Sequence, residues 1–182
     1  MNQSLPTWPD ELYDVLREQG VRQVACVPDA GHARLIRRFE DDPDVRLVRL
    51  TTEEEGVALL AGAHLGGQRG VMLIQSSGVG NCINMLALTN EGRFPLVMIV
   101  TMRGDEGEFN AMQVPMGHAT PTVLEAMGVM VQRARSADEI VPAVANAMSL
   151  AYNSNRAVAV LISQSIIGAK DFRKLTKAGE VE

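Results

Sequence analysis

Three consecutive acidic residues, Glu53 to Glu55, open a segment that is rich in alanine and glycine. Thr52 is a suitable N-cap, and Glu55 three residues later completes a capping box. We therefore expect a helix from about Glu53 to the glycine pair at 66 and 67. Helical spacing from Glu54 leads only to apolar residues, namely Val57, Ala58, Ala61 and Leu65. The pattern predicts that the Glu54 carboxyl group shares the buried face of its helix.

Two interpretations of Glu54 are open. An acid in the first turn of a helix can simply complement the helix dipole, which is worth roughly 0.3–1 kcal/mol at a surface. Alternatively, burial raises the pKa of the carboxyl group until it can donate and accept a proton near neutral pH. The small residues that follow favour the second interpretation, because each glycine costs a helix about 1 kcal/mol. Close approach of another backbone or of a ligand would explain their presence.

A glycine-bracketed turn, Gly78-Val79-Gly80, lies between an apolar segment and the next helical pattern. Such glycines let backbone amides approach a pyrophosphate, as in dinucleotide-binding loops. Ile83 replaces the third glycine of that fingerprint, and Thr101 and Met102 stand where an acid would contact a ribose. A dinucleotide site is therefore not favoured.

A 17-residue segment from Met102 to His118 has no clear periodicity and is rich in charge and glycine. Segments of this length are usually functional or mobile rather than simple connectors. Its Arg103, Gln113 and His118 offer a guanidinium, an amide and an imidazole, a set that suits an anion. Solvated loop side chains are the alternative. Asp105, Glu106 and Glu108 on the same segment would repel an anion unless they face solvent.

Apolar segments alternate with helical patterns along the chain. The expected strands are 23–27, 45–50, 71–74, 96–101, 129–132 and 157–162, and the intervening helices include 32–41, 53–65, 78–91 and 136–152. This alternation predicts one α/β domain, residues 1–168, in which helices cover both faces of a six-stranded, mostly parallel sheet. Residues 169–182 are expected to form a loosely ordered tail.

In such a sheet, ligands bind beyond the carboxyl ends of the strands. Asp29 and Gln75 follow two of these strands, and Glu54 and the 102–118 segment follow two others. Asp29 also suits an Asx turn or a helix cap, and this alternative stays open.

Composition excludes several classes of function. A net charge of −5, a pI near 5.3 and the lack of a long basic run argue against a nucleic-acid or anionic-membrane surface. No apolar stretch reaches about 18 residues and no signal peptide is evident, so we expect a cytoplasmic protein. Cys26 and Cys82 are expected to be buried thiols. The three histidines show no metal-ligand spacing, so no protein-built metal site is predicted.

Residues 54–63 and 71–81 resemble the pyrimidine-binding domain of thiamine-diphosphate enzymes. The matching strings are Glu54-Glu55-Gly56-Val57-Ala58, Ala61-Gly62-Ala63, Val71 to Gln75 and Gly78-Val79-Gly80-Asn81. Within that family, QSSGVGN and RGDEGEFNAMQVPMG are most similar to the sulfopyruvate and phosphonopyruvate decarboxylases. The similarity spans roughly residues 10 to 165.

This resemblance implies a role for several residues. Glu54 would bond the aminopyrimidine ring of thiamine diphosphate and so drive removal of the thiazolium proton. Pro28, Gln75, Gly78 and Asn81 would line the pyrimidine site. Asp29 would face the reacting substrate, although the usual Pro-Gly is Pro28-Asp29 here and a one-residue shift would place Ala30 at that position.

The family holds its diphosphate and Mg²⁺ with a Gly-Asp-Gly followed about thirty residues later by Asn, on a second domain. The nearest string here, Gly104-Asp105-Glu106, lacks the second glycine and a suitably placed Asn. The resemblance therefore implies a partner subunit that carries this motif and holds Mg²⁺, with thiamine diphosphate shared between the two chains of a hetero-oligomer.

The sequence predicts the pyrimidine-side subunit of a two-subunit decarboxylase for a short acidic 2-oxo acid, with Arg103, Gln113 and His118 toward the substrate. The alternative is a non-catalytic α/β module that binds a nucleotide or a partner and has kept the fold without the reaction.

Overall fold

The computed structural model describes residues 7–105 and 107–168, and the predicted tail 169–182 lies outside this part of the chain. Six strands form one sheet in the order β2-β1-β3-β4-β6-β5, and every neighbouring pair is parallel. The strands are β1 (Val21–Cys26), β2 (Arg46–Arg49), β3 (Arg69–Gln75), β4 (Leu96–Thr101), β5 (Met130–Ala134) and β6 (Ala157–Ile162). The predicted six-stranded α/β sheet is confirmed.

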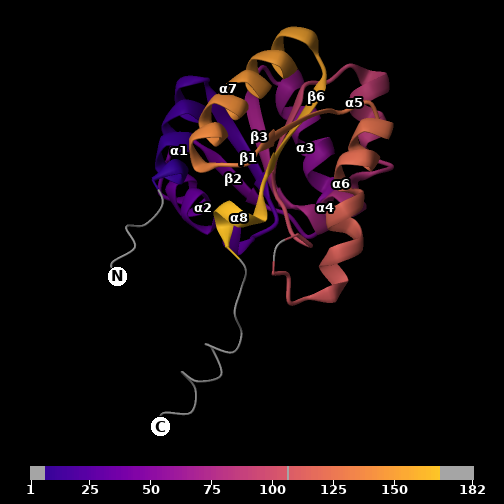
Figure 1. Ribbon diagram of the computed structural model, residues 1–182. Coiled ribbons are helices and arrows are strands. Elements are labelled where there is room, and N and C mark those ends of the chain that lie inside the picture. The colour runs from indigo at the N-terminus through magenta and orange to yellow at the C-terminus, as the bar shows by residue number, and fades with distance from the viewer. Residues whose placement is uncertain (1–6, 106, 169–182) are drawn as a thin grey trace.

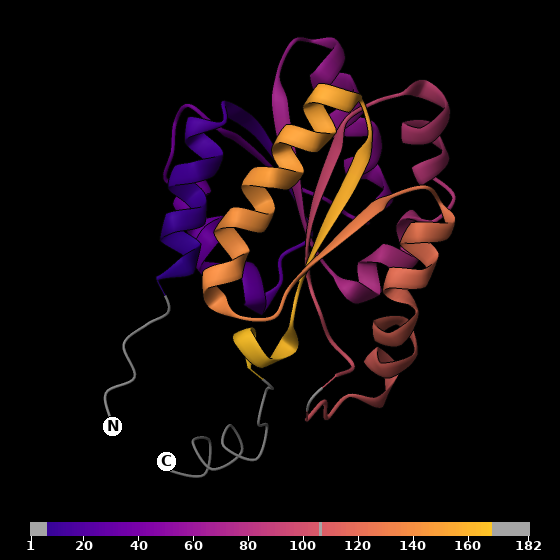
Figure 2. The ribbon, with the colours of Figure 1, turned by 45° about the horizontal axis from the view of Figure 1, so that its top comes forward.

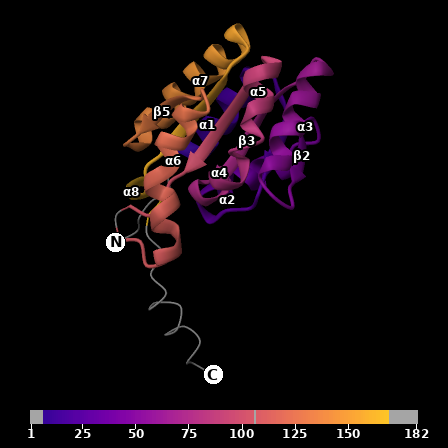
Figure 3. The same cartoon turned by 90° about the vertical axis from the view of Figure 1, so that its right-hand side faces the viewer.

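Helices cover both faces of this sheet, and Figure 3 shows the three layers edge-on. The first face carries α1 (Trp8–Glu18), α2 (Ala33–Glu40) and α7 (Ala137–Ser154). The second carries α3 (Glu54–Leu65), α4 (Ser76–Cys82), α5 (Leu86–Gly92) and α6 (Val114–Ala126). In Figure 2, α1 and α7 lie side by side across the first face.

The central strands are buried on both faces because helices lie above and below them. Every residue of β4 and β6 is buried. Along β4, Val97 and Ile99 pack under α1 and α7, whereas Leu96, Met98 and Val100 pack under the helices of the opposite face. This alternation is the two-residue period of a strand, and it explains why the sequence reads as an unbroken apolar run.

The carboxyl ends of the strands meet along one edge, which is the lower edge in Figure 1. The short helix α8 (Gln164–Ile167) follows β6 there, and α4 follows β3. Two 3₁₀ turns, η1 (Ala30–His32) and η2 (Ala111–Gln113), belong to the segments that leave β1 and β4. This edge is where the predicted site residues were expected.

Two predicted boundaries are wrong. The expected helix 78–91 is two helices, α4 and α5. Between them the chain forms a turn, in which Ala87 N donates to Asn84 O and Leu88 N donates to Met85 O, each three residues back. The irregular segment after β4 ends earlier than expected. Asn110 accepts a bond from Met112 N to begin η2, and α6 starts at Val114 with Pro115 in its first turn.

The cysteines are buried free thiols, as predicted. Burial raises the pKa of Cys26 to about 11 and that of Cys82 to about 12. None of the helices in the described part of the chain combines the length and the apolar character needed to cross a membrane.

Candidate active site

Asp29 connects the carboxyl ends of three neighbouring strands. Its Oδ1 accepts a hydrogen bond from Gln75 Nε2 at 2.9 Å, at the end of β3. Its Oδ2 accepts bonds from Thr101 Oγ1 at 2.7 Å, at the end of β4, and from Gly31 N at 3.0 Å. Asp29 itself follows β1 and caps η1. The Asx-turn and cap geometry that the sequence left open is therefore present.

These contacts decide the charge of Asp29. Burial raises the pKa of its carboxyl group, but the bonds from Thr101, Gln75 and Gly31 and the proximity of His32 outweigh burial, so the net pKa lies below the usual range. Asp29 is held ionised with its oxygens occupied by donors of its own chain. A role toward the substrate stays a prediction.

His32 lies beneath this edge and is fully buried. Its Nε2 is 3.3 Å from Ile74 O and 3.1 Å from Ile99 O, so Nε2 carries the hydrogen. Its Nδ1 has no hydrogen-bond partner in the described part of the chain. Burial lowers the pKa of the imidazole more strongly than Asp29 and the two backbone carbonyls raise it.

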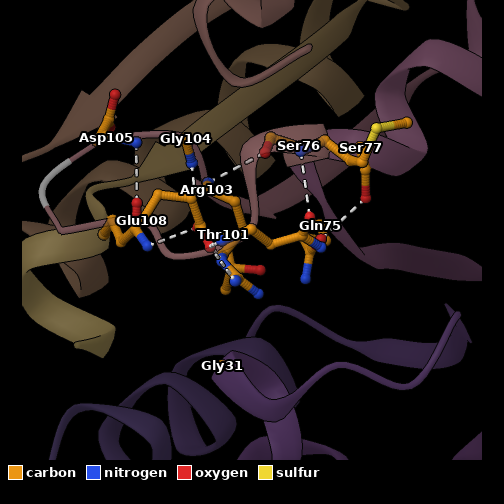
Figure 4. Close-up of polar contacts among 12 residues, drawn as sticks. Gly31, Gln75, Ser76, Ser77, Thr101, Arg103, Gly104, Asp105 and Glu108 are labelled. Carbon is orange, nitrogen blue, oxygen red and sulfur yellow. Dashed lines mark hydrogen bonds and ion pairs between the residues drawn. The ribbon is translucent and has the colours of Figure 1, made fainter. Parts of the chain in front are cut away.

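Arg103, predicted to meet a substrate, is buried and forms an ion pair within its own segment. Its Nε and Nη2 each lie 2.6 Å from a carboxylate oxygen of Glu108. The exposed fractions of the two side chains are 8% and 2%. Gln164 Nε2 and Asn110 N donate to the same carboxylate. Figure 4 shows Arg103 and Glu108 beside Gln75 and Ser76.

From the sequence, the acids of this segment would repel an anion unless they face solvent, and the structure shows that Glu108 instead pairs with Arg103. The hydrogen bonds from Arg103 lower the pKa of Glu108 to about 2, with smaller contributions from Asn110, Gln164 and Gly104. The charge of Arg103 is therefore balanced within the chain. Glu106 lies outside the described residues.

A second group of residues surrounds the start of α3. Glu53 is buried, with an exposed fraction of 8%, and its Oε2 accepts a hydrogen bond of 2.7 Å from Asn81 Nδ2 on α4. A Cβ atom at Gly78 would overlap the Glu53 carboxylate. Gly78 is thus required for the close approach of α4 to the first turn of α3.

Glu54 itself is only half-buried, which corrects the predicted burial. Its Oε2 accepts a hydrogen bond from the Thr52 hydroxyl. This bond and one from the Glu54 backbone lower the pKa of the carboxyl group, whereas the sequence predicted a raised pKa. The expected capping box is also wrong, because Glu55 Oε2 accepts from Thr51 N and helix α3 begins at Glu54.

The reason for this correction is the direction of the helix. The buried residues of α3 are Gly56, Val57, Leu60 and Ala61, which follow Glu53 at helical spacing. Of the residues that follow Glu54 at that spacing, Ala58 and Leu65 are exposed. The buried stripe therefore begins one residue earlier than the sequence analysis placed it.

The remaining predicted residues lie along the same edge. Pro28 is exposed directly before Asp29. Gln113 ends η2, and its Oε1 is buried without a hydrogen-bond partner in the described residues. His118 is exposed on α6. No three His, Cys, Asp or Glu side chains of the described residues gather in a way that could hold a metal ion.

Sequence reasoning missed four residues of this edge, which are Glu53, Thr101, Glu108 and Gln164. Glu53 could have been found by testing each of the three glutamates against the apolar stripe. The other three carry no local signal, because their partners come from distant elements or from inside an irregular segment.

Residues 7–119 match the family of thiamine pyrophosphate enzymes, in the N-terminal TPP binding domain. The chain belongs to this family. It is 34% identical over 157 residues to the sulfopyruvate decarboxylase α subunit of Methanothermobacter thermautotrophicus, covering 86% of this chain and 95% of that subunit. It is also 42% identical over 108 residues to a phosphonopyruvate decarboxylase of Streptomyces viridochromogenes, covering 58% of this chain and 27% of the relative.

The fold of this thiamine pyrophosphate family member recurs in solved structures. One is the 2-oxoglutarate:ferredoxin oxidoreductase of Magnetococcus marinus, with a TM-score of 0.68 and 16% identity. The match covers 87% of this chain and 29% of that one, so the chain spans less than a third of this larger protein. At this identity the similarity shows the shared fold.

The contact between Gly78 and Glu53 can be tested by stability. We expect Gly78→Ala to lower the free energy of unfolding by about 1–3 kcal/mol, because the added methyl group overpacks a close contact. Gly62→Ala is the matched control, since Gly62 is also helical and has no neighbouring atom within 4 Å of an added Cβ. It should leave stability unchanged or raise it by up to about 1 kcal/mol. Equal effects in urea denaturation would contradict the contact.

The buried ion pair predicts a pH dependence of stability. The folded-state pKa of Glu108, about 2, lies below its ordinary value. The ionised Glu108 therefore adds its full share to the free energy of unfolding when the pH is above the ordinary pKa, and this share is lost as the pH falls toward 2. Glu108→Gln should destabilise the protein at pH 7 by about 3–5 kcal/mol and flatten the acid limb of the stability curve. Glu125→Gln, at an exposed acid on α6, should leave both unchanged. An acid limb of the same steepness in Glu108→Gln would refute this assignment.

Proposed function

We propose that this chain is the pyrimidine-side subunit of a two-subunit, thiamine-diphosphate-dependent decarboxylase for a short acidic 2-oxo acid of the sulfopyruvate or phosphonopyruvate type. The observation that carries the proposal is the similarity over 95% of the length of a sulfopyruvate decarboxylase α subunit. The shorter similarity to a phosphonopyruvate decarboxylase supports the same class of substrate.

The described residues suit the pyrimidine half of the cofactor. When bound, thiamine diphosphate supplies the chemistry that stabilises the carbanion left by decarboxylation. Glu54 presents a carboxylate at the start of α3 whose bonds are to the Thr52 hydroxyl and its own backbone. That carboxylate would hold and move a proton at a ring nitrogen of the aminopyrimidine. Gln75, Gly78 and Asn81, with Pro28, would form the protein wall around the ring.

Glu53 would fix this arrangement. Its bond to Asn81 and its contact with Gly78 hold the turn of α4 against the first turn of α3. The orientation of Glu54 follows, because it is the next residue on that turn. Glu53 is therefore a positioning residue and Glu54 the proposed catalytic residue.

Full activity of Glu54 would depend on a second chain. A carboxyl group needs a raised pKa to exchange protons near neutral pH, and desolvation is the usual cause. In this chain Glu54 is half-exposed and its pKa is lowered. We propose that the partner subunit covers this site, supplies the Gly-Asp-Gly…Asn motif, and holds the diphosphate and Mg²⁺.

The outer side of α3 is a suitable contact for that subunit. It exposes Ala58 and Gly62, and Leu65 is 74% exposed. Small side chains permit close packing between helices, and burial of an exposed leucine in an interface is energetically favourable. This surface continues from Glu54 along the same helix.

Substrate contacts would come from the segment that follows β4. Arg103 lies close to Asp29, and both line a small pocket with Gly31. The Arg103 charge is already balanced by Glu108, so we propose that Arg103 shapes the pocket. Exposed His118 and half-buried Gln113 are freer to meet the anionic group.

Glu54→Gln tests the proposed catalytic role. In the complex copurified with the diphosphate-binding subunit, we expect turnover to fall by about 10²–10⁴-fold, with folding and cofactor affinity retained. Proton exchange at the thiazolium carbon, followed by NMR, should slow by a similar factor. Glu55→Gln is the control, because Glu55 is an exposed acid one residue away. The isolated chain should bind the cofactor weakly and be inactive. Unchanged exchange in Glu54→Gln would remove this residue from the mechanism.

Substitutions of Arg103 and His118 test the substrate class. His118→Ala should raise KM for sulfopyruvate or phosphonopyruvate several-fold and spare pyruvate, because only the charged substrates carry a second anionic group. Arg103→Ala should impair all three substrates, since it leaves the Glu108 carboxylate buried without its cation. Steady-state kinetics on the three 2-oxo acids separates the two outcomes. A His118→Ala loss that is equal on all substrates would argue against a contact with the distal anion.

A further inference from the structure

A cavity of about 330 Å³ opens at the carboxyl ends of β5 and β6, at the edge of the sheet away from β2. Its polar lining comes from Arg133, Arg135, Ser163, Ser165 and Asp105. It lies two to three inter-strand spacings from β3, or about 10–14 Å. None of the residues assigned above to the pyrimidine or the substrate lines it.

Arg133 is the next-to-last residue of β5, and Arg135 directly follows the strand. Both line the cavity, as expected for residues two apart in an extended chain, whose side chains leave it in the same direction. The ladder continues past the end of β6, where Ser163 N donates to Ala134 O at 3.0 Å. At the start of α7, Arg135 N donates to Glu139 Oε2 at 2.7 Å. The main chain of this part of the wall is therefore fixed.

The opposite wall is also held in place. The hydroxyls of Ser163 and Ser165 are 2.9 Å apart. Asp105 N donates to Gln164 Oε1 at 2.9 Å, and Gln164 in turn donates to Glu108. The Asp105 carboxylate thus lies at a rim that is anchored to the Arg103–Glu108 ion pair.

The charges favour an anionic ligand. Two guanidinium groups and one carboxylate give the lining an excess of one positive charge. Within the described residues, neither Arg133 nor Arg135 has an ion pair or a side-chain hydrogen bond. Guanidinium groups bind phosphate through paired N–H donors, and the serine pair adds one hydroxyl donor that is not used between the two serines.

The remaining lining narrows the ligand further. Met102, Ala134 and Leu161 form an apolar part of the wall, and Asp105 can accept hydrogen bonds at the rim. The volume lies at the lower end of the range of small-molecule sites, roughly 300–1,000 Å³, and exceeds what a lone phosphate ion would fill.

We infer that this cavity binds a small phosphomonoester, with the phosphate between Arg133 and Arg135 and a hydroxyl or amino group of the ligand donating to Asp105. The phosphate accepts a hydrogen bond from whichever of Ser163 and Ser165 does not donate to the other. Because Asp105 is tied through Gln164 to Glu108, the ligand contacts the same segment that carries Arg103.

Calorimetry and amide NMR on the full chain test this inference with glycerol 3-phosphate as the probe. We expect saturable binding, with shifts centred on Ala134, Arg135, Ser163 and Asp105. The double variant Arg133→Gln/Arg135→Gln should weaken binding by at least about 10-fold, the typical effect of losing a charge-assisted hydrogen bond. Arg46→Gln is the matched control, because Arg46 is an exposed arginine on β2, the opposite edge strand.

Further probes separate the parts of the ligand. Inorganic phosphate should bind more weakly than glycerol 3-phosphate, and glycerol and propionate should not bind measurably. Asp105→Asn should strengthen binding of inorganic phosphate, because a repelling charge is removed. It should therefore reduce the ratio of the affinity for glycerol 3-phosphate to the affinity for inorganic phosphate. The inference is overturned if propionate binds as well as the two phosphate compounds, or if the double arginine variant binds glycerol 3-phosphate unchanged. It is also overturned if neither inorganic phosphate nor glycerol 3-phosphate binds at about 10 mM.

Discussion

The parallel direction of all six strands is the constraint on which the functional edge depends. It brings the residues that follow β1, β3 and β4 to one place, where their polar groups must find partners as they leave water. Asp29 meets this requirement for three strand ends at once by accepting bonds from Gln75, Thr101 and Gly31. The Arg103–Glu108 pair meets it for the segment after β4. In each case the carboxylate is stabilised by donors that come from its own chain.

Some polar side chains of this edge have hydrogen-bond or ionic partners within the chain, whereas others stay accessible. Asp29, Arg103, Glu108 and Glu53 have partners that hold them in fixed positions. Glu54 lies beside Glu53 on the same turn, yet its carboxylate is half-exposed and its pKa is lowered. The electrostatics of the single chain thus leave Glu54 accessible but not desolvated. This division agrees with a site that two chains complete together, as the proposed function requires.

Close backbone contacts set the geometry of the segment that follows β4. A Cβ atom at Gly104, where φ is +83°, would lie 2.7 Å from Gln113 O. One at Gly117 would overlap the carbonyl of Arg103. The first turn of α6 therefore packs directly on the residues that leave β4. The ion pair of Glu108 with Arg103 holds the residues between these two elements in place. A region that looks irregular in sequence is in fact folded around one ion pair.

The sequence alone determined the class of the fold and the position of its edge. Buried runs such as Leu96 to Thr101 predict central parallel strands, because a strand covered on both faces must be apolar throughout. The resemblance around Glu54 and Gly78 predicted the family to which the chain belongs.

Tertiary structure alone decided which polar groups are buried and paired. Asp29 and Thr101 are 72 residues apart, and Glu53 and Asn81 are 28 apart, so no local period reports these bonds. Helical spacing could not choose between Glu53 and Glu54, because small apolar residues follow both. Packing against the sheet and against α4 decides which face of α3 is buried, and that face begins at Glu53. Local pattern shows that a helix has a buried side, whereas the neighbouring elements determine which residue begins it.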